Sequence, residues 1–164
     1  MERSRSEYRL QHLVEADLSE VPVRPDSLRV RHVERADHEA LARLMLDAYR
    51  GSIDDEGENI EDARTAIDHY FETIVWPHSF VIVGGDQPLA MSMVVIVDRF
   101  HYIDPVATAA GHKGQGLGRI AVATSLRSLT KSGITEVGAV ITVGNAPSER
   151  LFTRFGFVRV GGWG

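Results

Sequence analysis

A glycine-rich stretch about two-thirds of the way along the chain has the residue types that bind phosphate groups. Gly114, Gly116 and Gly118 occupy alternate positions between an extended apolar run and a segment with helical periodicity. Because glycine has no Cβ atom, such a loop can turn several backbone N–H groups inward around an anion, and a following helix points its free N–H groups at the same place. Lys113 and Arg119 flank the glycines and add positive charge. The stretch predicts a phosphate or pyrophosphate site, with a flexible turn between strand and helix as the alternative.

The glycine spacing differs from that of two common nucleotide sites. The chain has no Gly-x-x-x-x-Gly-Lys-Ser/Thr string, which a Walker A loop requires. A dinucleotide-binding fingerprint reads Gly-x-Gly-x-x-Gly after the first strand of a parallel sheet, whereas this loop reads Gly-x-Gly-x-Gly and lies late in the chain. A nucleotide-binding domain of another fold is therefore only a remote alternative.

Two motifs together resemble the GCN5-related N-acetyltransferase (GNAT) family. Residues 113–118, Lys-Gly-Gln-Gly-Leu-Gly, are similar to the family's acyl-CoA pyrophosphate loop, Arg/Gln-x-x-Gly-x-Gly/Ala. Residues 145–157 are similar to its later Asn…Leu-Tyr-x-x-x-Gly-Phe segment, in the same order and at about the same separation. The resemblance covers roughly residues 28–161. It implies an acetyl-CoA-dependent N-acetyltransferase that acetylates a primary amine of a small molecule or a peptide.

The resemblance also implies where acetyl-CoA binds. In the family, two central strands splay apart, pantetheine pairs with the backbone of the strand before the glycine loop, and the phosphates bind the N–H groups of the loop. The cofactor-binding residues are then expected to be Val106, Ala107, Thr108, Lys113, Gly114, Gln115, Gly116, Leu117, Gly118, Arg119 and Asn145. Lys113 replaces the family's usual Arg or Gln, which we expect to be tolerated because lysine serves phosphate as a point charge.

A candidate general base follows from the same comparison, because the attacking amine must lose a proton. Some relatives carry their base four or six residues ahead of the position that corresponds to Thr108, which gives Asp104 and Tyr102 here. Asp104 is the first choice, and a turn role before the following proline is its alternative. Glu56, in the acidic segment 52–62, is a third candidate.

The sequence offers several candidates for the general acid. The family often uses a tyrosine of the last helix, and Phe152 stands at that position. Ser148 or a water molecule could protonate the leaving thiolate, and CoA thiolate also leaves unaided. The missing tyrosine keeps a second function class open, a non-catalytic acyl-CoA-binding or regulatory module.

The acceptor is indicated only by charge. The segment 52–62 carries the carboxylates of Asp54, Asp55, Glu56, Glu58, Glu61 and Asp62. A solvated loop is the ordinary explanation, and an electrostatic attraction for a cationic amine acceptor is the alternative.

Composition narrows the class of protein. The chain has 164 residues, 43% of them apolar and 25% charged, as expected for one globular domain. The absence of cysteine excludes disulfides, thiolate catalysis and cysteine zinc sites, and no His-x-x-x-His pair with a carboxylate indicates a metal. The net charge of −5 argues against nucleic acid as a partner. No apolar run is long enough to span a membrane or to form a signal peptide, so we expect a cytoplasmic protein without membrane contact.

Hydrophobic periodicity predicts the order β-α-α-β-β-β-α-β-α-β. The expected strands are residues 27–33, 79–83, 89–97, 100–108, 134–143 and 157–160, and the expected helices are residues 36–50, 59–74, 117–131 and 145–155. This order fits the α/β (α+β) fold that the resemblance implies, a mixed, mostly antiparallel sheet of about six strands flanked by about four helices. Pro105 predicts a bulge or a free edge in the third strand of the middle group, because proline cannot donate to a ladder.

The ends of the chain are expected to lie outside this core. Residues 1–26 are interpreted as an N-terminal arm, disordered or docked, in which residues 8–14 could form a short strand, and residues 27–164 as a single GNAT-like domain. Family members usually carry one more strand after the one at residues 157–160, so we expect an open edge there. The arm or a second copy of the chain, in a homodimer, could cover that edge.

Overall fold

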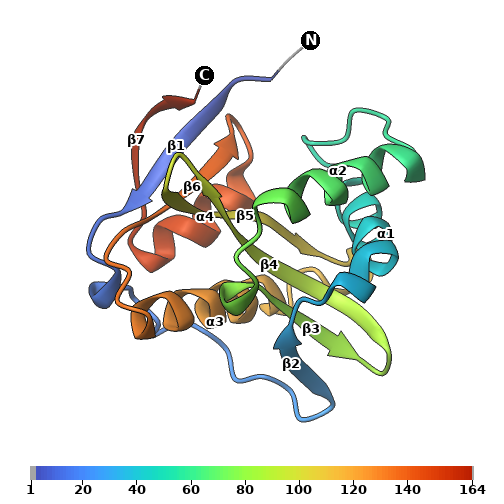
Figure 1. The fold of residues 1–164 in the computed structure, drawn as a ribbon, viewed down its shortest axis with the longest axis horizontal. Helices are drawn as coiled ribbons and strands as arrows, with labels where there is room; N and C mark the ends of the chain where they lie inside the picture. Colours follow the sequence, from blue (N-terminus) through green and yellow to red (C-terminus); the bar gives the residue numbers. More distant parts are fainter. Residues whose placement is uncertain (1–2, 164) are drawn as a thin grey trace.

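The computed structural model describes residues 3–163 as a seven-stranded sheet between two pairs of helices (Figure 1). The strand order is β2-β3-β4-β5-β6-β1-β7, and all neighbours are antiparallel except β5 and β6, which are parallel. The strands are β1 (Arg5–Leu10), β2 (Leu28–His32), β3 (Phe80–Gly84), β4 (Gln87–Val97), β5 (Phe100–Thr108), β6 (Val137–Thr142) and β7 (Val158–Trp163).

Helices cover both faces of this sheet. The α-helices are α1 (His38–Tyr49), α2 (Ile60–Thr73), α3 (Leu117–Lys131) and α4 (Ala146–Phe155). Single 3-10 turns occur at η1 (Leu13–Glu15), η2 (Arg35–Asp37), η3 (Trp76–His78) and η4 (Ala110–His112). Side chains of α1 and α2 share one core cluster with Val81 and Val83 of β3, whereas Ile82 between them packs with α3 on the opposite face. The alternation of β3 therefore separates the two helical layers.

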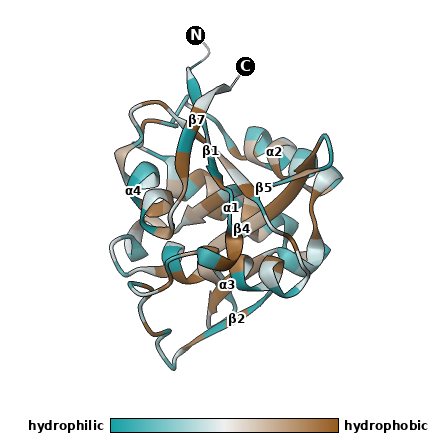
Figure 2. Ribbon diagram, turned by 90° about the vertical axis from the view of Figure 1, so that its left-hand side faces the viewer, coloured by the Kyte–Doolittle hydropathy of each residue, from teal (hydrophilic) through white to brown (hydrophobic). Residues whose placement is uncertain are grey.

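The helices form where the sequence pattern predicts them. The apolar stripe of α1, from Leu41 to Ala48, is buried against the sheet, and Figure 2 shows apolar residues gathered between the helices and strands. The Asn59 and Asn145 side chains accept hydrogen bonds from backbone N–H groups in the first turns of α2 and α4. Gly156, with φ of +106°, ends α4 in the left-handed conformation that favours glycine.

The sheet has one strand more than the sequence indicated. From residue 28 onward the predicted order of elements is confirmed, and the mixed, mostly antiparallel sheet with four helices is confirmed as well. The additional strand is β1, which lies between β6 and β7 and pairs antiparallel with both. Residues 5–10 are therefore an inner strand of the sheet, and the sheet extends across the boundary between residues 26 and 27.

The edge strands are β2 and β7 within residues 3–163. The N-terminal strand covers the inner side of β7, as one of the two sequence alternatives proposed, and the outer side of β7 pairs with none of the described residues. No helix among those residues is long and apolar enough to cross a membrane.

Two irregularities in the middle of the sheet create the space for a site. Val106 pairs with Ser92, and Ile103 pairs with Val94, so two residues of β5 oppose a single residue of β4. This is the bulge that Pro105 predicts. On its other side, β5 pairs with β6 only at Tyr102 and Gly138, and the two strands part beyond that point. The splayed central strands that the resemblance implies are therefore present.

Candidate active site

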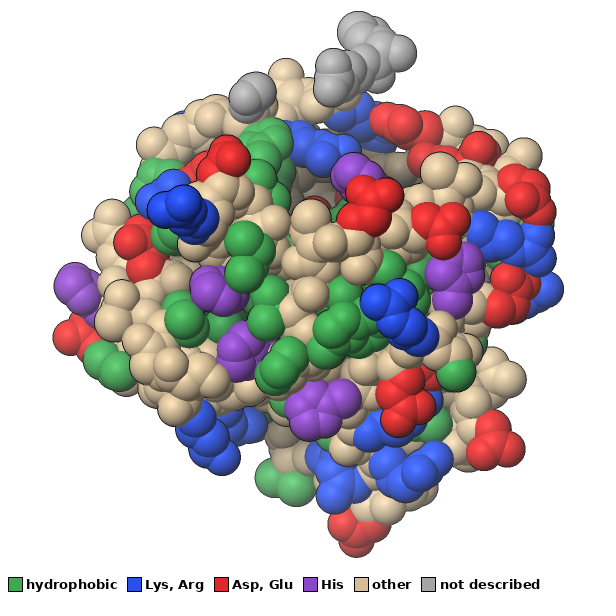
Figure 3. Space-filling view, viewed as in Figure 1, with side chains coloured by type: hydrophobic (Ala, Val, Ile, Leu, Met, Phe, Trp, Pro, Cys, Tyr) green, Lys and Arg blue, Asp and Glu red, His purple; other side chains and the backbone are tan. Residues whose placement is uncertain are grey.

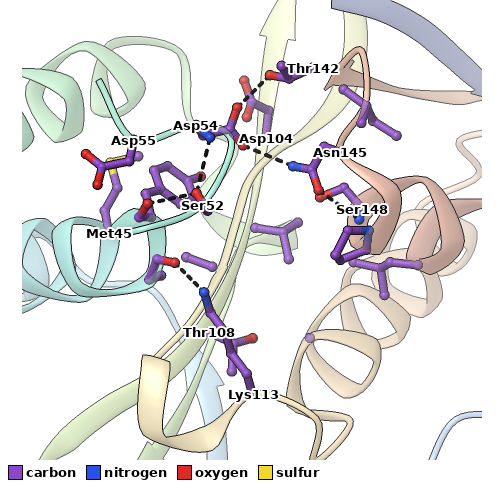
Figure 4. Close-up of a pocket in the computed structure, with 18 of the residues that line it drawn as sticks. Met45, Ser52, Asp54, Asp55, Asp104, Thr108, Lys113, Thr142, Asn145 and Ser148 are labelled. Carbon is purple, nitrogen blue, oxygen red and sulfur yellow. Dashed lines mark hydrogen bonds between the residues drawn. The ribbon is translucent and has the colours of Figure 1, made fainter. Parts of the chain in front are cut away.

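A cavity of about 1100 Å³ opens where β5 and β6 part. Its walls come from the second half of β5, the glycine loop, the segment between α1 and α2, the N-terminal end of β1, and the beginning of α4 (Figure 4). The expected site residues that line it are Glu56, Asp104, Val106, Ala107, Thr108, Lys113, Gly114, Gly116, Leu117, Gly118, Arg119, Asn145 and Ser148. Gln115 is exposed beside the cavity without lining it.

Tyr102, the second candidate base, does not line the cavity. Its ring packs edge-to-face between Phe100 and Trp163, with centroid distances of 5.0 and 5.3 Å. Its hydroxyl donates a hydrogen bond of 3.3 Å to Glu7. The reason is its position, because Tyr102 is the residue of β5 that still pairs with Gly138 of β6, before the strands separate.

The glycine loop presents an uninterrupted series of backbone donors. Gly114 and Gly116 have φ of +83° and +79°, a backbone conformation that residues other than glycine rarely adopt. Helix α3 begins directly after Gly116. The backbone N–H groups from Gly114 to Arg119 donate to no protein group within residues 3–163. Successive free N–H groups at the start of a 15-residue helix favour an anion. The geometry supports a phosphate site over a flexible turn.

Helix α1 holds this loop in place. The Lys113 ammonium donates a hydrogen bond to the carbonyl oxygen of Ala48, at the end of α1 (Figure 4). The carboxylate of Asp47 accepts a hydrogen bond of 2.7 Å from the backbone N–H of Ala110. Lys113 therefore anchors the loop to α1, in addition to placing positive charge beside the free N–H groups.

The connector between β1 and β2 packs on the other side of the loop. Arg119 Nη1 donates a hydrogen bond of 3.0 Å to the carbonyl oxygen of Glu20. A Cβ atom on Gly116 would lie 2.5 Å from Pro22 Cγ, so only glycine fits beneath the proline. No local sequence pattern indicates this contact, because about a hundred residues separate its two sides.

Asp104 is half-buried at the bulge, four residues before Thr108. The pKa of its carboxyl is raised to about 6, mainly by burial and also by the charge of Asp54, although Arg5 and the Tyr70 hydroxyl act to lower it. Burial and the Asp104 charge likewise raise the pKa of Tyr49 and of Tyr70, so both phenols stay protonated. A carboxylate with this pKa is ionised at neutral pH and binds a proton more strongly than an ordinary one, as a general base must.

Asp54 lines the cavity and forms hydrogen bonds across its mouth. The sequence alone does not distinguish this residue from its acidic neighbours. Its carboxylate accepts hydrogen bonds of 2.6 Å from Thr142 Oγ1 and 3.0 Å from Asn145 Nδ2 (Figure 4). Asn145 in turn accepts a hydrogen bond of 3.2 Å from the Ser148 backbone N–H. One chain of polar contacts thus joins the acidic segment to the start of α4. In the sequence, Asp54 is one of six neighbouring carboxylates, and only the fold distinguishes it.

The other acidic side chains of this segment mostly stabilise their own loop. Asp55 accepts hydrogen bonds from the backbone N–H groups of Gly51 and Gly57, at 2.7 and 2.9 Å. Asp62 accepts one of 2.9 Å from the Asn59 N–H as part of the cap of α2. Glu56 is exposed at the cavity rim. These contacts weaken the idea that the segment acts mainly as an electrostatic attraction for cations.

The start of α4 offers no tyrosine hydroxyl to the cavity. Phe152 is buried and packs edge-to-face on Phe157, with 5.1 Å between ring centroids. Ser148 lines the cavity one turn earlier and is half-buried. Among residues 3–163, no group of three or more His, Asp or Glu side chains is placed to hold a metal ion.

Comparison with known proteins agrees with this geometry. The model of the Acetyltransferase (GNAT) family matches residues 38–157. No curated protein matches the chain. A GCN5-related N-acetyltransferase from Sphaerobacter thermophilus superposes with a TM-score of 0.72 at 14% identity, over 98% of this chain and 49% of that one. The family match and the fold rule out the remote alternative, a nucleotide-binding domain of another fold.

Two further solved structures share the fold. A tandem GNAT protein from the clavulanic acid biosynthesis pathway has a TM-score of 0.73 at 15% identity, over 98% of this chain and 51% of that one. AAC(6')-Iy, in complex with a bisubstrate analogue that contains CoA, has a TM-score of 0.60 at 12% identity, over 80% of this chain and 90% of that one. The chain spans about half the length of the Sphaerobacter and tandem proteins.

Proposed function

The chain belongs to the acetyltransferase (GNAT) family, and from that premise we propose that it transfers an acetyl group from acetyl-CoA to a primary amine of a small molecule or peptide. One observation carries the proposal. A single cavity holds the free N–H groups of residues 114–119 near one end of β5 and the Asp104 carboxylate four residues back along the same strand. Four extended residues span roughly 13 Å, so the anion site and the candidate base are well separated.

The acyl donor is assigned from the first of these features. The N–H groups of the glycine loop and the side chain of Lys113 suit a pyrophosphate. The free side of β5 at Val106, Ala107 and Thr108, where the strand has no β6 partner, offers backbone groups to an extended chain such as pantetheine. Leu117, Gly118, Arg119 and Asn145 complete the proposed donor site, and Gln115 supplies only its backbone N–H.

The reaction assigns Asp104 the role of general base. It accepts a proton from the amine, whose nitrogen then attacks the thioester carbonyl carbon. The C–N bond forms, the C–S bond breaks, and the thiolate leaves with the bonding electron pair. The nitrogen releases its second proton to water as it becomes the amide. Ser148 or water supplies a proton to that thiolate, because Phe152 has none to give. Glu56 takes the role of base only if Asp104 proves dispensable.

Phe152 also favours a second function, a non-catalytic acyl-CoA-binding or regulatory module. Such a module keeps the anion site and needs no proton donor. The two functions differ in whether thiol is released from acetyl-CoA.

The proposed partners are acetyl-CoA and an amine that is cationic in water, without nucleic acid, membrane or metal. We also propose that a second copy of the chain covers the outer side of β7, where Val158, Val160 and Trp163 are exposed. Light scattering tests this homodimer, and a monomer would contradict it.

A panel of amines and peptide N-termini, with thiol release from acetyl-CoA as the readout, tests the proposed function. We expect turnover with at least one acceptor. Acetyl-CoA at about 100 times its Kd should also raise the Tm by roughly 5–11 °C. Stabilisation without turnover would indicate the non-catalytic module, and neither effect would contradict both functions.

A further inference from the structure

We propose that the acceptor is an amino acid or a close analogue, whose amine meets Asp104 and whose carboxylate binds the Arg5 guanidinium. The inference rests on the proposed acetyl transfer and adds to it the substrate class. The expected acceptor is then a small zwitterion and not a simple cation, because the acceptor end of the cavity holds charges of both signs.

The fold brings Arg5 to the acceptor end of the cavity. Arg5 begins β1, and its pairing partner on β6 is Thr142, the residue that donates to Asp54. The side chain lines the cavity and lowers the pKa of Asp104, so the two charged groups are neighbours. This arrangement exists only because β1 is an inner strand of the sheet beside β6.

Arg5 has no competing role within the described part of the chain. No carboxylate among residues 3–163 lies within 4.0 Å of its guanidinium, and no hydrogen bond from it is formed there. The Arg5 charge thus lowers the pKa of Asp104, although the two groups are too far apart to form an ion pair. A small molecule that carries an ammonium and a carboxylate on the same carbon atom satisfies both groups at once.

A second guanidinium lies at the same end. Arg3 lines the cavity, and its Nη2 donates a hydrogen bond of 3.2 Å to the Asp55 carbonyl oxygen. Its Nη1 is buried and has no hydrogen-bond partner among residues 3–163. A buried donor without a partner is unfavourable, so an anionic group near Arg3 and Arg5 would correct the deficit.

The surface around the cavity mouth is mixed in charge in the same way. Figure 3 shows basic and acidic side chains on either side of a hollow between β1 and α2. Asp55 and Asp62 accept hydrogen bonds from their own loop, and Asp54 accepts them from Thr142 and Asn145. The carboxylates left for an ammonium are therefore mainly Asp104 and, at the rim, Glu56. A long polycation would find few free carboxylates and would meet two arginines.

The test compares matched acceptors in matched variants. Each L-amino acid is compared with its α-amide as acceptor for wild type, Arg5→Gln, Arg5→Lys and the control Arg29→Gln, at about pH 8, where Asp104 is ionised. Arg29 is an exposed arginine of β2 whose guanidinium, among residues 3–163, donates only to the Gly85 carbonyl oxygen. The control therefore loses the same charge outside the cavity. The variant comparison cancels the different basicity of acids and amides.

For the best acceptor we expect Arg5→Gln to lower kcat/KM for the acid by roughly ten- to a hundred-fold, and to leave the amide nearly unchanged. Arg5→Lys should recover part of the loss, and Arg29→Gln should behave as wild type. An equal loss for acid and amide would overturn the inference, because Arg5 would then act on Asp104 or on the fold. So would no loss for either.

The outcome stays distinguishable from a failure of acetyl transfer itself. If no amine releases thiol, the proposed function fails, and calorimetric titration of the same acids and amides into the protein with CoA then decides the inference. Tighter binding of an acid that Arg5→Gln abolishes supports the carboxylate site. Equal binding of acid and amide contradicts it.

Discussion

The Asp54 carboxylate accepts a hydrogen bond of 3.0 Å from Asn145 Nδ2 across the mouth of the cavity. The two residues are far apart in the sequence, and each also has a local role. Asn145 caps α4 through Ser148, and Asp54 lies in the segment that leads to α2. This bond joins the proposed acceptor end to the helix beside the proposed donor site. A substitution of Asp54 should therefore affect both ends of the cavity.

Asp54→Ala tests that connection. Loss of the hydrogen bonds to Thr142 and Asn145 should loosen the segment 52–59 and raise KM for the acceptor about ten-fold, while kcat changes less. Amide hydrogen exchange should become faster in that segment. Asp86→Ala is the control, because it removes an exposed carboxylate from the turn between β3 and β4, away from the cavity. Unchanged exchange and KM in Asp54→Ala would show that the bond across the mouth is dispensable.

The pH dependence of kcat/KM should report Asp104. Its pKa is raised to about 6, and only the ionised form accepts a proton, so activity should fall as the pH drops through about 6. Arg5 lowers this pKa, so Arg5→Gln should move the acid limb to higher pH. Asp54 raises it, so Asp54→Asn should move the limb to lower pH. Shifts of the same sign in both variants would contradict the assignment.

The glycine loop can be tested with a glycine whose backbone tolerates a side chain. Gly118 has no positive φ, and a Cβ there would lie 3.4 Å from Thr108 Oγ1, an ordinary contact inside the cavity. We expect Gly118→Val to abolish the rise in Tm with acetyl-CoA while the free protein still unfolds cooperatively. Gly116 is less suitable, because a side chain there would collide with Pro22.

Gly133→Ala is the matched control for that variant. Its φ of +79° predicts a loss of about 1 kcal/mol in stability, and no atom lies within 4 Å of the added Cβ. This variant should keep the full Tm shift with acetyl-CoA. A normal shift in Gly118→Val would mean that the anion site lies elsewhere.

The sequence predicted the elements whose signals are local. The four helices and the bulge at Pro105 each depend on a few neighbouring residues, and the structure has them all. The glycine loop was predictable for the same reason, since its glycines lie at alternate positions of one short stretch and resemble a known motif.

The acceptor end was not predictable in the same way. Its charged groups, Arg5, Asp54 and Asp104, come from three distant segments, and only the insertion of β1 beside β6 brings them together. The alternating pattern of β1 is short and weak, and a strand that pairs with neighbours more than a hundred residues away leaves no local mark. The position of Tyr102 outside the cavity follows from the point at which β5 and β6 part, which depends on their pairing and which no sequence pattern gives.

Steady-state kinetics of Asp104→Asn test the central claim most directly. Asparagine keeps the shape of the side chain and cannot accept the amine's proton, so kcat should fall by about 10²–10⁴. The Tm shift with acetyl-CoA should persist, because the proposed donor site contacts β5 through its backbone nearer Thr108. A variant that binds acetyl-CoA and keeps near-normal kcat would contradict the account, and would assign the proton transfer to Glu56 or to water.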